Sequence, residues 1–166
     1  MEHQVFEASL DKLSKLIFVG VLVLFAFTIL FIGIALKDQP LALVFPLLIL
    51  TITLIGTLLY SPLRYIVSDE GIQIVRRINT FTIEGKMIDQ VIAISKEDLG
   101  IALRLAGNGG MLGYTGWYTS KIGKTRWFVT QRKNYILIKT TDKKQYLISP
   151  NDPEGFLLAV HAKPSL

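Results

Sequence analysis

The sequence contains no cysteine, only two histidines and, from residue 16 to residue 63, almost no charge. Without cysteine the chain can form no disulfide, no thiolate nucleophile and no cysteine-ligated metal site. His3 and His161 lie near opposite ends of the chain, so they do not indicate a shared metal site. Ser120 and Lys121 are neighbours, but adjacency in sequence does not make a nucleophile and its base. The sequence therefore predicts no catalytic residues, no metal site and no cofactor.

The scarcity of charge marks out two long apolar segments. Residues 16–36 form an uncharged run of 21 residues, and residues 41–60 form a second run of 20. At about 1.5 Å per helical residue, each run is long enough to cross the roughly 30 Å of hydrocarbon in a bilayer. The joining residues 37–40 are too few for anything but a tight turn. We expect a transmembrane helical hairpin over residues 16–60.

Basic residues flank both ends of this expected hairpin. Lys12 and Lys15 precede it, and Arg64, Arg76 and Arg77 follow it. Because cytoplasmic flanks carry the excess of Lys and Arg, we expect a cell-membrane protein with two spans and both termini in the cytoplasm. A cleaved signal peptide would be the alternative for the first run, but that run is longer than a usual signal core and lacks a following A-x-A cleavage site.

These boundaries divide the chain into three parts. Residues 1–15 are expected to form an N-terminal cytoplasmic tail, residues 16–60 the hairpin, and residues 62–166 a separate domain. From residue 64 onward the chain holds 15 basic and 9 acidic residues, which gives a net charge of +6. Such a charge can attract the domain to anionic lipid, at about 1 kcal/mol per basic residue, or it can simply keep the domain solvated.

Short β-rich runs alternate with turn residues in the C-terminal part. Seven strands are predicted, at residues 64–68, 71–78, 80–83, 87–95, 126–131, 135–140 and 145–149. Short strands in this number favour a small barrel or a bent sandwich. Asp152 followed by Pro153 then indicates the start of a helix with Phe156, Leu157 and Val160 on one face. We expect this C-terminal helix to cap the barrel.

Three features occur together in this part of the chain. They are the segment Tyr65–Ile72 directly after two apolar runs, a glycine-rich segment from Gly107 to Gly116, and a closing segment from Ile148 to Phe156. In combination they resemble the bacterial pleckstrin-homology-like (PH-like) family, over about residues 62–160. The resemblance implies a mainly-β PH-like barrel of about seven strands capped by a C-terminal helix.

The first turn of the expected barrel is acidic. PH domains that bind phosphoinositides usually place Lys and Arg around their first hairpin, whereas Asp69 and Glu70 occupy that turn here. Two adjacent carboxylates would repel a phosphorylated headgroup. The resemblance therefore does not imply headgroup recognition at this turn.

The segment 107–124 is rich in glycine and aromatic residues. The residues that could bind a ligand or partner are Gly107, Gly109, Gly110, Tyr114, Trp117 and Tyr118. Glycine permits positive φ and close backbone approach, so the segment could form an anion-binding lip. It could also be a long structural loop, or a docking loop that uses its Trp and Tyr side chains as anchors.

Taken together, these features predict a membrane-tethered, non-catalytic binding or scaffold module. Its expected partner is a protein or peptide at the membrane face. The alternative is a sensor whose glycine-rich loop 107–124 binds an anionic lipid headgroup or a small ligand. Arg104, Lys121, Lys124 and Arg126 would then supply the positive charge. No nucleic-acid partner is expected.

Overall fold

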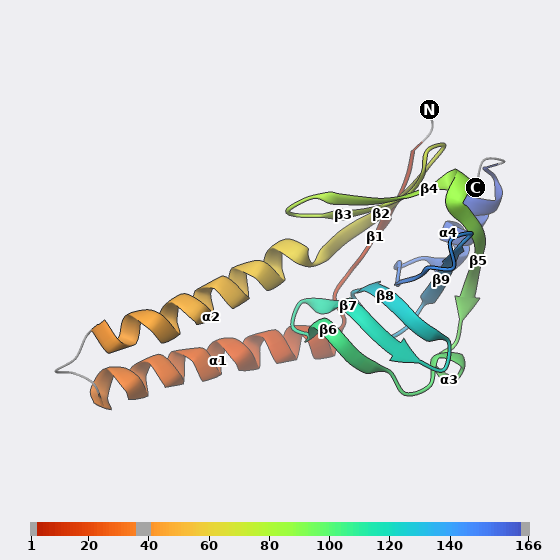
Figure 1. Ribbon diagram of the computed structural model, residues 1–166. Coiled ribbons are helices and arrows are strands. Elements are labelled where there is room, and N and C mark those ends of the chain that lie inside the picture. The colour runs from red at the N-terminus through yellow and green to blue at the C-terminus, as the bar shows by residue number, and fades with distance from the viewer. Residues whose placement is uncertain (1–2, 36–40, 164–166) are drawn as a thin grey trace.

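The computed structural model describes residues 3–35 and 41–163 (Figure 1). A mainly-β domain occupies one end of the molecule, and two long helices project from it. The elements in chain order are β1 (Gln4–Glu7), α1 (Lys12–Ala35), α2 (Leu41–Tyr60), β2 (Pro62–Ser68), β3 (Gly71–Arg76), β4 (Thr80–Glu84), η1 (Gly85–Met87), β5 (Ile88–Ile94), α3 (Lys96–Leu99), β6 (Leu103–Gly110), β7 (Gly113–Ser120), β8 (Gly123–Val129), β9 (Tyr135–Thr140), β10 (Gln145–Ile148) and α4 (Pro153–His161).

The two projecting helices are the apolar segments of the sequence. They lie side by side and run in opposite directions (Figure 1), and they line a shared apolar groove that includes Phe25 and Leu50. Within the described residues, α1 is the one helix both long and apolar enough to cross a membrane, with a mean hydropathy of 3.0. The apolar stretch Val44–Tyr60 of α2 is shorter. The turn expected at residues 37–40 lies outside the described residues.

The first sheet has the strand order β1-β2-β3-β4 and is antiparallel throughout. Strand β1 precedes the helices, and it pairs with β2, which follows them. Residues 4–7, expected within an N-terminal tail, are therefore part of the domain. Phe6 packs inward while Val5 is exposed, which is the alternation of a half-buried strand.

The second sheet has the order β5-β9-β10-β8-β7-β6. Its pairs are antiparallel except for β10 with β8, which is parallel. The described residues thus form ten strands rather than about seven, because β1, β6 and β7 were not predicted. A glycine-rich loop was expected at residues 107–124, but β6 and β7 cover residues 107–110 and 113–120 of it, so that expectation is wrong for these residues. Glycine has a low strand propensity, so its abundance concealed the hairpin.

The core lies between the two sheets and is closed by α4. Tyr65, Ile74, Phe128 and Ile138 are buried in it together with Phe156 of α4. The phenol of Tyr65 donates a hydrogen bond of 2.6 Å to the carbonyl of Phe128. The predicted mainly-β domain with a C-terminal helix is confirmed.

Helix α4 begins where the sequence indicates. The Asp152 carboxylate accepts a hydrogen bond of 2.9 Å from the Gly155 amide, and Pro153 occupies the first helical position. The ring of Phe156 meets that of Phe6 edge to face, with centroids 5.2 Å apart. Strand β1 and helix α4 therefore support each other through one aromatic contact.

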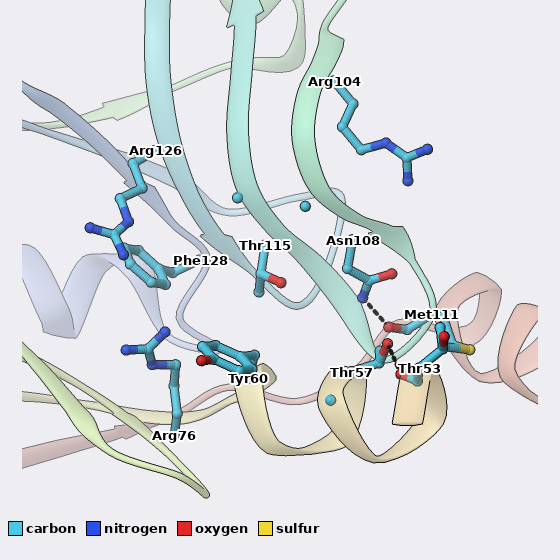
Figure 2. A pocket seen from close by; sticks show the side chains of 13 residues that line it. Thr53, Thr57, Tyr60, Arg76, Arg104, Asn108, Met111, Thr115, Arg126 and Phe128 are labelled. Carbon is cyan, nitrogen blue, oxygen red and sulfur yellow. Dashed lines mark hydrogen bonds between the residues drawn. The ribbon is translucent and has the colours of Figure 1, made fainter. Parts of the chain in front are cut away.

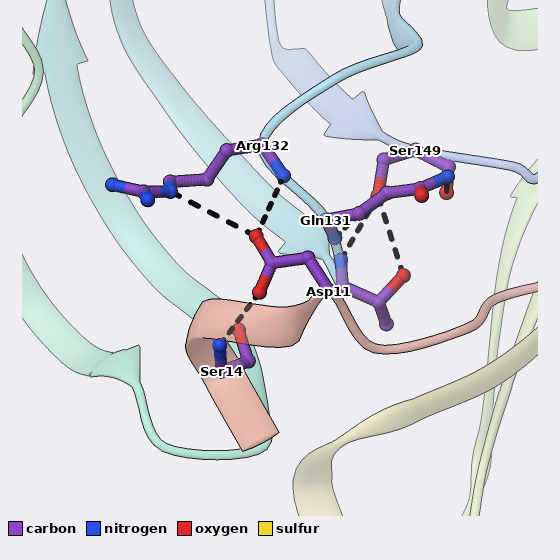
Figure 3. A network of polar contacts seen from close by, with 6 residues as sticks. Asp11, Ser14, Gln131, Arg132 and Ser149 are labelled. Atoms are coloured by element: carbon purple, nitrogen blue, oxygen red, sulfur yellow. Dashed lines mark hydrogen bonds and ion pairs between the residues drawn. The ribbon is translucent and has the colours of Figure 1, made fainter. Parts of the chain in front are cut away.

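A polar network fixes the start of α1 to the domain (Figure 3). The Asp11 carboxylate accepts hydrogen bonds from the amides of Ser14, at 2.6 Å, and Arg132, at 3.2 Å. Burial alone would raise the pKa of Asp11, but these hydrogen bonds and the Arg132 charge lower it below its usual value. The Ser149 hydroxyl accepts hydrogen bonds from the amides of Thr130, at 2.9 Å, and Gln131, at 3.3 Å. These bonds order the loop that also contains Arg132.

Candidate functional site

A cavity of about 480 Å³ lies where α2 meets the second sheet (Figure 2). Its volume is within the range of small-molecule sites. Three arginines line it, and none of its lining residues is acidic. The lining residues are Thr53, Gly56, Thr57, Tyr60, Arg76, Arg104, Gly107, Asn108, Met111, Thr115, Gly116, Arg126 and Phe128.

The α2 wall of the cavity consists of two threonines, one glycine and one tyrosine. Its residues Thr53, Gly56, Thr57 and Tyr60 share one face of the helix. The hydroxyls of Thr53 and Thr57 donate to the carbonyls one turn earlier, both at 2.8 Å, so their donors are already used. A Cβ atom added at Gly56 would meet nothing within 4 Å. This wall therefore offers open space and few polar groups.

Two glycines form the opposite wall. Gly107 of β6 and Gly116 of β7 are register partners, with φ of +113° and +129°. A Cβ on either residue would come within 2.2 Å of a carbonyl oxygen of the other strand. Only glycine permits this backbone conformation together with so close an approach. The two residues therefore have a structural role in bringing the strands together beside α2.

Arg76, the last residue of β3, is the most enclosed cation of the cavity. Its exposed fraction is 9%, and its Nε atom is buried without a hydrogen-bond partner. The guanidinium carbon lies 5.4 Å from the ring centroid of Tyr60 and 5.5 Å from that of Phe128. Within the described chain no carboxylate pairs with it. Burial lowers the pKa of Arg76, and the nearby positive charge of Arg126 lowers it further.

Arg126 of β8 lies close to the same phenyl ring. Its guanidinium carbon is 5.2 Å from the centroid of Phe128 and 4.6 Å from that of Phe81. The ammonium of Lys124 lies 4.9 Å above the ring of Trp117, which Arg126 also approaches at 5.8 Å. Aromatic faces thus hold several cations together. This arrangement can attract and hold an anion.

The neighbouring Arg77 differs from Arg76 in having a structural partner. Its guanidinium donates a hydrogen bond of 3.1 Å to the carbonyl of Leu58, near the C-terminal end of α2. A cation at that position complements the free carbonyls and the negative end of the helix dipole. Of the two adjacent arginines, Arg76 is the one whose buried Nε atom has no hydrogen-bond partner among the described residues.

A family model described as Bacterial PH domain matches residues 63–163, which is more than half of the chain. The chain belongs to the bacterial PH domain family. No curated protein and no solved structure matches it. PH-like domains are in general binding modules, so the match favours a binding or scaffold role for this domain. Strand β1 and both long helices lie outside the matched residues.

The first hairpin turn of the PH domain lies far from the arginine cavity. Asp69 and Glu70 form the turn between β2 and β3, at the end of β2 remote from α2. The carboxylate of Asp69 pairs with Lys163 at 2.6 Å. Among the described residues, no cluster of His, Asp and Glu is placed to hold a metal ion.

The residues proposed from the sequence do not converge on one site. Arg104, Gly107 and Arg126 line the arginine cavity, although Arg104 points away from Arg76 and Arg126 (Figure 2). Gly110 lies at the end of the β6–β7 hairpin, against Ile17 of α1.

Lys121 does not line the arginine cavity. It lies in the β7–β8 turn, where its stem packs on Gly100 of the PH domain. Lys124 and Trp117 contact each other beside Arg126. Of the four cations proposed from the sequence, Arg126 is therefore the one that shares an aromatic contact with Arg76, whereas Lys124 lies near Arg126 without lining the cavity.

The remaining proposed residues border a second cavity of about 300 Å³. Gly109, Tyr114 and Tyr118 line it with Arg104 and Arg132. The Tyr118 hydroxyl donates to the carbonyl of Asn108, and burial raises the pKa of Tyr118 to about 12. Arg132 is already engaged with the Asp11 carboxylate, 3.8 Å away. The Trp127 indole N–H, which also lines this cavity, is buried without a partner among the described residues. Because Tyr118 and the one partnered arginine, Arg132, are already engaged, this cavity is the weaker candidate for an anion.

Sequence reasoning missed the most important members of the arginine cavity. Arg76 was interpreted only as a determinant of membrane orientation, and Tyr60 and Thr57 only as parts of a span. Their positions beside Phe128 depend on contacts between α2, β3 and β8. The one available signal was the doublet Arg76-Arg77 without a nearby acid in sequence.

Proposed function

We propose that this chain is a membrane-anchored, non-catalytic binding module that holds an anionic group in the arginine cavity of its PH domain. The single observation that carries the proposal is the enclosed guanidinium of Arg76, which has no carboxylate partner among residues 3–35 and 41–163. A buried cation is strongly unfavourable unless an opposite charge accompanies it. Arg126 adds to this unfavourable free energy, because a second positive charge then lies close to the ring of Phe128. A bound anion removes both costs.

The membrane anchor in this proposal consists of α1 and α2, both crossing the bilayer. Pairing of β1 with β2 supports it, because the flank before α1 and the flank after α2 then lie on the same side. Lys12 and Lys15 on one flank and Arg64 on the other favour the cytoplasm for that side. The arginine cavity then opens at the cytoplasmic face of the membrane. Accessibility labelling of single cysteines introduced at either flank tests the topology.

Anion binding is tested on the full chain in neutral detergent micelles, by the midpoint of thermal unfolding. Two anions are added separately: inorganic phosphate, against chloride at equal ionic strength, and phosphatidylglycerol, against phosphatidylcholine. A ligand that binds only the folded state raises the midpoint. We expect at least one anion to raise it for the natural chain and to have a much smaller effect on Arg76→Gln.

Arg64→Gln is the matched control for this experiment. Arg64 also follows α2 directly, but it is exposed and lines neither cavity. It should respond to both anions as the natural chain does. Equal midpoints with and without either anion, or equal responses of the Arg76 and Arg64 variants, would contradict the proposed function.

A second candidate function is supported by the free edge of the second sheet. Strand β6 is the outermost strand, and its Leu103 and Leu105 side chains are 63% and 56% exposed. An extended peptide can add to such an edge through main-chain hydrogen bonds. A photo-crosslinker at Leu105 should then give one defined protein adduct in native membranes. The same probe at Thr82, on the polar edge strand β4, should give none.

A further inference from the structure

We infer that the anionic group is the phosphate of a membrane phospholipid whose acyl chains lie along α2. The inference rests on the proposed function and specifies the ligand of the same cavity. It is supported by the chemical character of the α2 wall, by the depth of Arg76 relative to the membrane, and by the balance of charge around the cavity.

The cavity has one polar side and one side built on an apolar helix. Arg76 and Arg126 belong to the PH domain, whereas the opposite wall belongs to α2. Further along α2, Ile52 and Ile55 are exposed, as expected for side chains that contact hydrocarbon. A water-soluble anion would contact the arginines but would make no apolar contact along this helix. A phospholipid presents a phosphate to the arginines and an apolar chain to the helix.

Tyr60 places the guanidinium of Arg76 at headgroup level. It is the last residue of α2, and its side chain is 49% exposed. Aromatic residues of this kind collect at the boundary between hydrocarbon and water. Arg76 lies 5.4 Å from that ring, so its charge is at the depth where lipid phosphates are found. The ligand needs no movement out of the bilayer to reach it.

The charges around the cavity favour an anionic lipid over a zwitterionic one. Arg76 and Arg126 can each donate paired hydrogen bonds to phosphate oxygens. Lys124 adds a third positive charge nearby, and the lining includes no carboxylate to receive a choline group. A zwitterionic headgroup would bring its own cation against these residues. Phosphatidylglycerol brings none.

A substitution at Gly56 distinguishes a lipid ligand from a soluble phosphate ligand. A Cβ atom added at this position would meet no atom within 4 Å, and a leucine side chain would extend from the α2 wall, where an acyl chain would lie. Gly56→Leu should therefore reduce lipid binding and leave the arginines free for inorganic phosphate. Gly33→Leu is the matched control, because Gly33 is also open on all sides and lies in α1, away from the cavity.

The experiment is native mass spectrometry of the full chain released from nanodiscs of equal phosphatidylglycerol and phosphatidylcholine. We expect the natural chain to retain one phosphatidylglycerol. The retained fraction should fall about tenfold in Arg76→Gln and in Arg126→Gln. Gly56→Leu should lose the lipid as well, whereas Gly33→Leu and Arg64→Gln should keep it. In a parallel titration, millimolar inorganic phosphate should displace little lipid.

Three outcomes overturn the inference, and they are distinguishable. If phosphate displaces the lipid fully and Gly56→Leu retains it, the ligand is a soluble phosphate and the proposed anion site stands. If the adduct is absent from the natural chain and phosphate also fails to stabilise it, both the inference and the proposed function are wrong. Equal retention of the two lipids would likewise overturn the assignment to an anionic headgroup.

Discussion

Glu7 of β1 lies opposite Arg64 of β2 in the antiparallel register, although the whole of α1 and α2 separates them in the chain. This pairing ties the entrance of the first helix to the exit of the second. The hydrogen-bond network of Asp11 adds a second attachment at the start of α1. The helices and the PH domain are therefore held together next to the arginine cavity.

Removing the aromatic contact of β1 should weaken the whole domain. Phe6→Ala deletes a ring that packs at 5.2 Å on Phe156, and since Phe6 is only partly buried we expect a loss of about 2 kcal/mol in the free energy of unfolding. Val5→Ala is the control, because Val5 faces outward on the same strand. Denaturant unfolding of both variants in neutral detergent provides the comparison. Equal stabilities would show that β1 contributes nothing to the domain.

Tyr65 should make the domain sensitive to alkaline pH. Burial raises its pKa from 10.0 to about 12, so between these values the unfolded chain loses a proton that the folded chain retains. The free energy of unfolding should therefore fall as the pH rises through this window. Tyr118 and Tyr135, whose pKa values are also raised to about 12, contribute in the same direction.

Tyr65→Phe isolates the contribution of this residue. At neutral pH it should lower stability by about 1–3 kcal/mol, because the Phe128 carbonyl loses its hydrogen-bond donor. Between pH 10 and 12 the variant should lose less stability than the natural chain, since the contribution of Tyr65 is then absent. Urea unfolding across this range measures both effects. Parallel curves for the two proteins would contradict the role assigned to Tyr65.

Gly116 should be intolerant of any side chain. Gly116→Ala places a Cβ within 2.2 Å of the Ala106 carbonyl at a φ of +129°, so we expect a loss of well over 1 kcal/mol in stability. At Gly109 the nearest atoms belong to the flexible side chain of Arg104, and Gly109→Ala should be tolerated. Thermal unfolding of the two variants compares them directly. Similar midpoints would contradict the structural role of the Gly107–Gly116 pair.

Local signals in the sequence were enough to predict some elements and not others. Asp152 and Pro153 mark the start of α4 through their own backbone preferences, which act within one turn. Strand β1 is only four residues long, and its partner β2 is distant in sequence. The β6–β7 hairpin was not predicted because its glycines resemble a loop. Those glycines are needed for the close approach of two strands, which is a tertiary contact that the sequence does not show.

The sequence predicted only part of the arginine cavity. Arg104, Gly107 and Arg126 were chosen because they lie in or near an unusual segment, and the structure places them in the lining. Arg76 was not chosen, because nothing in its sequence neighbourhood distinguishes it from Arg77. Its unpaired charge becomes evident only when α2, β3 and β8 come together around Phe128.

The most direct test of the account is a crystal structure of the full chain grown with phosphatidylglycerol. The account predicts phosphate density between the guanidinium groups of Arg76 and Arg126, with an acyl chain passing Gly56 along α2. An empty arginine cavity at saturating lipid, or lipid bound only at the Asp69–Glu70 turn, would contradict it.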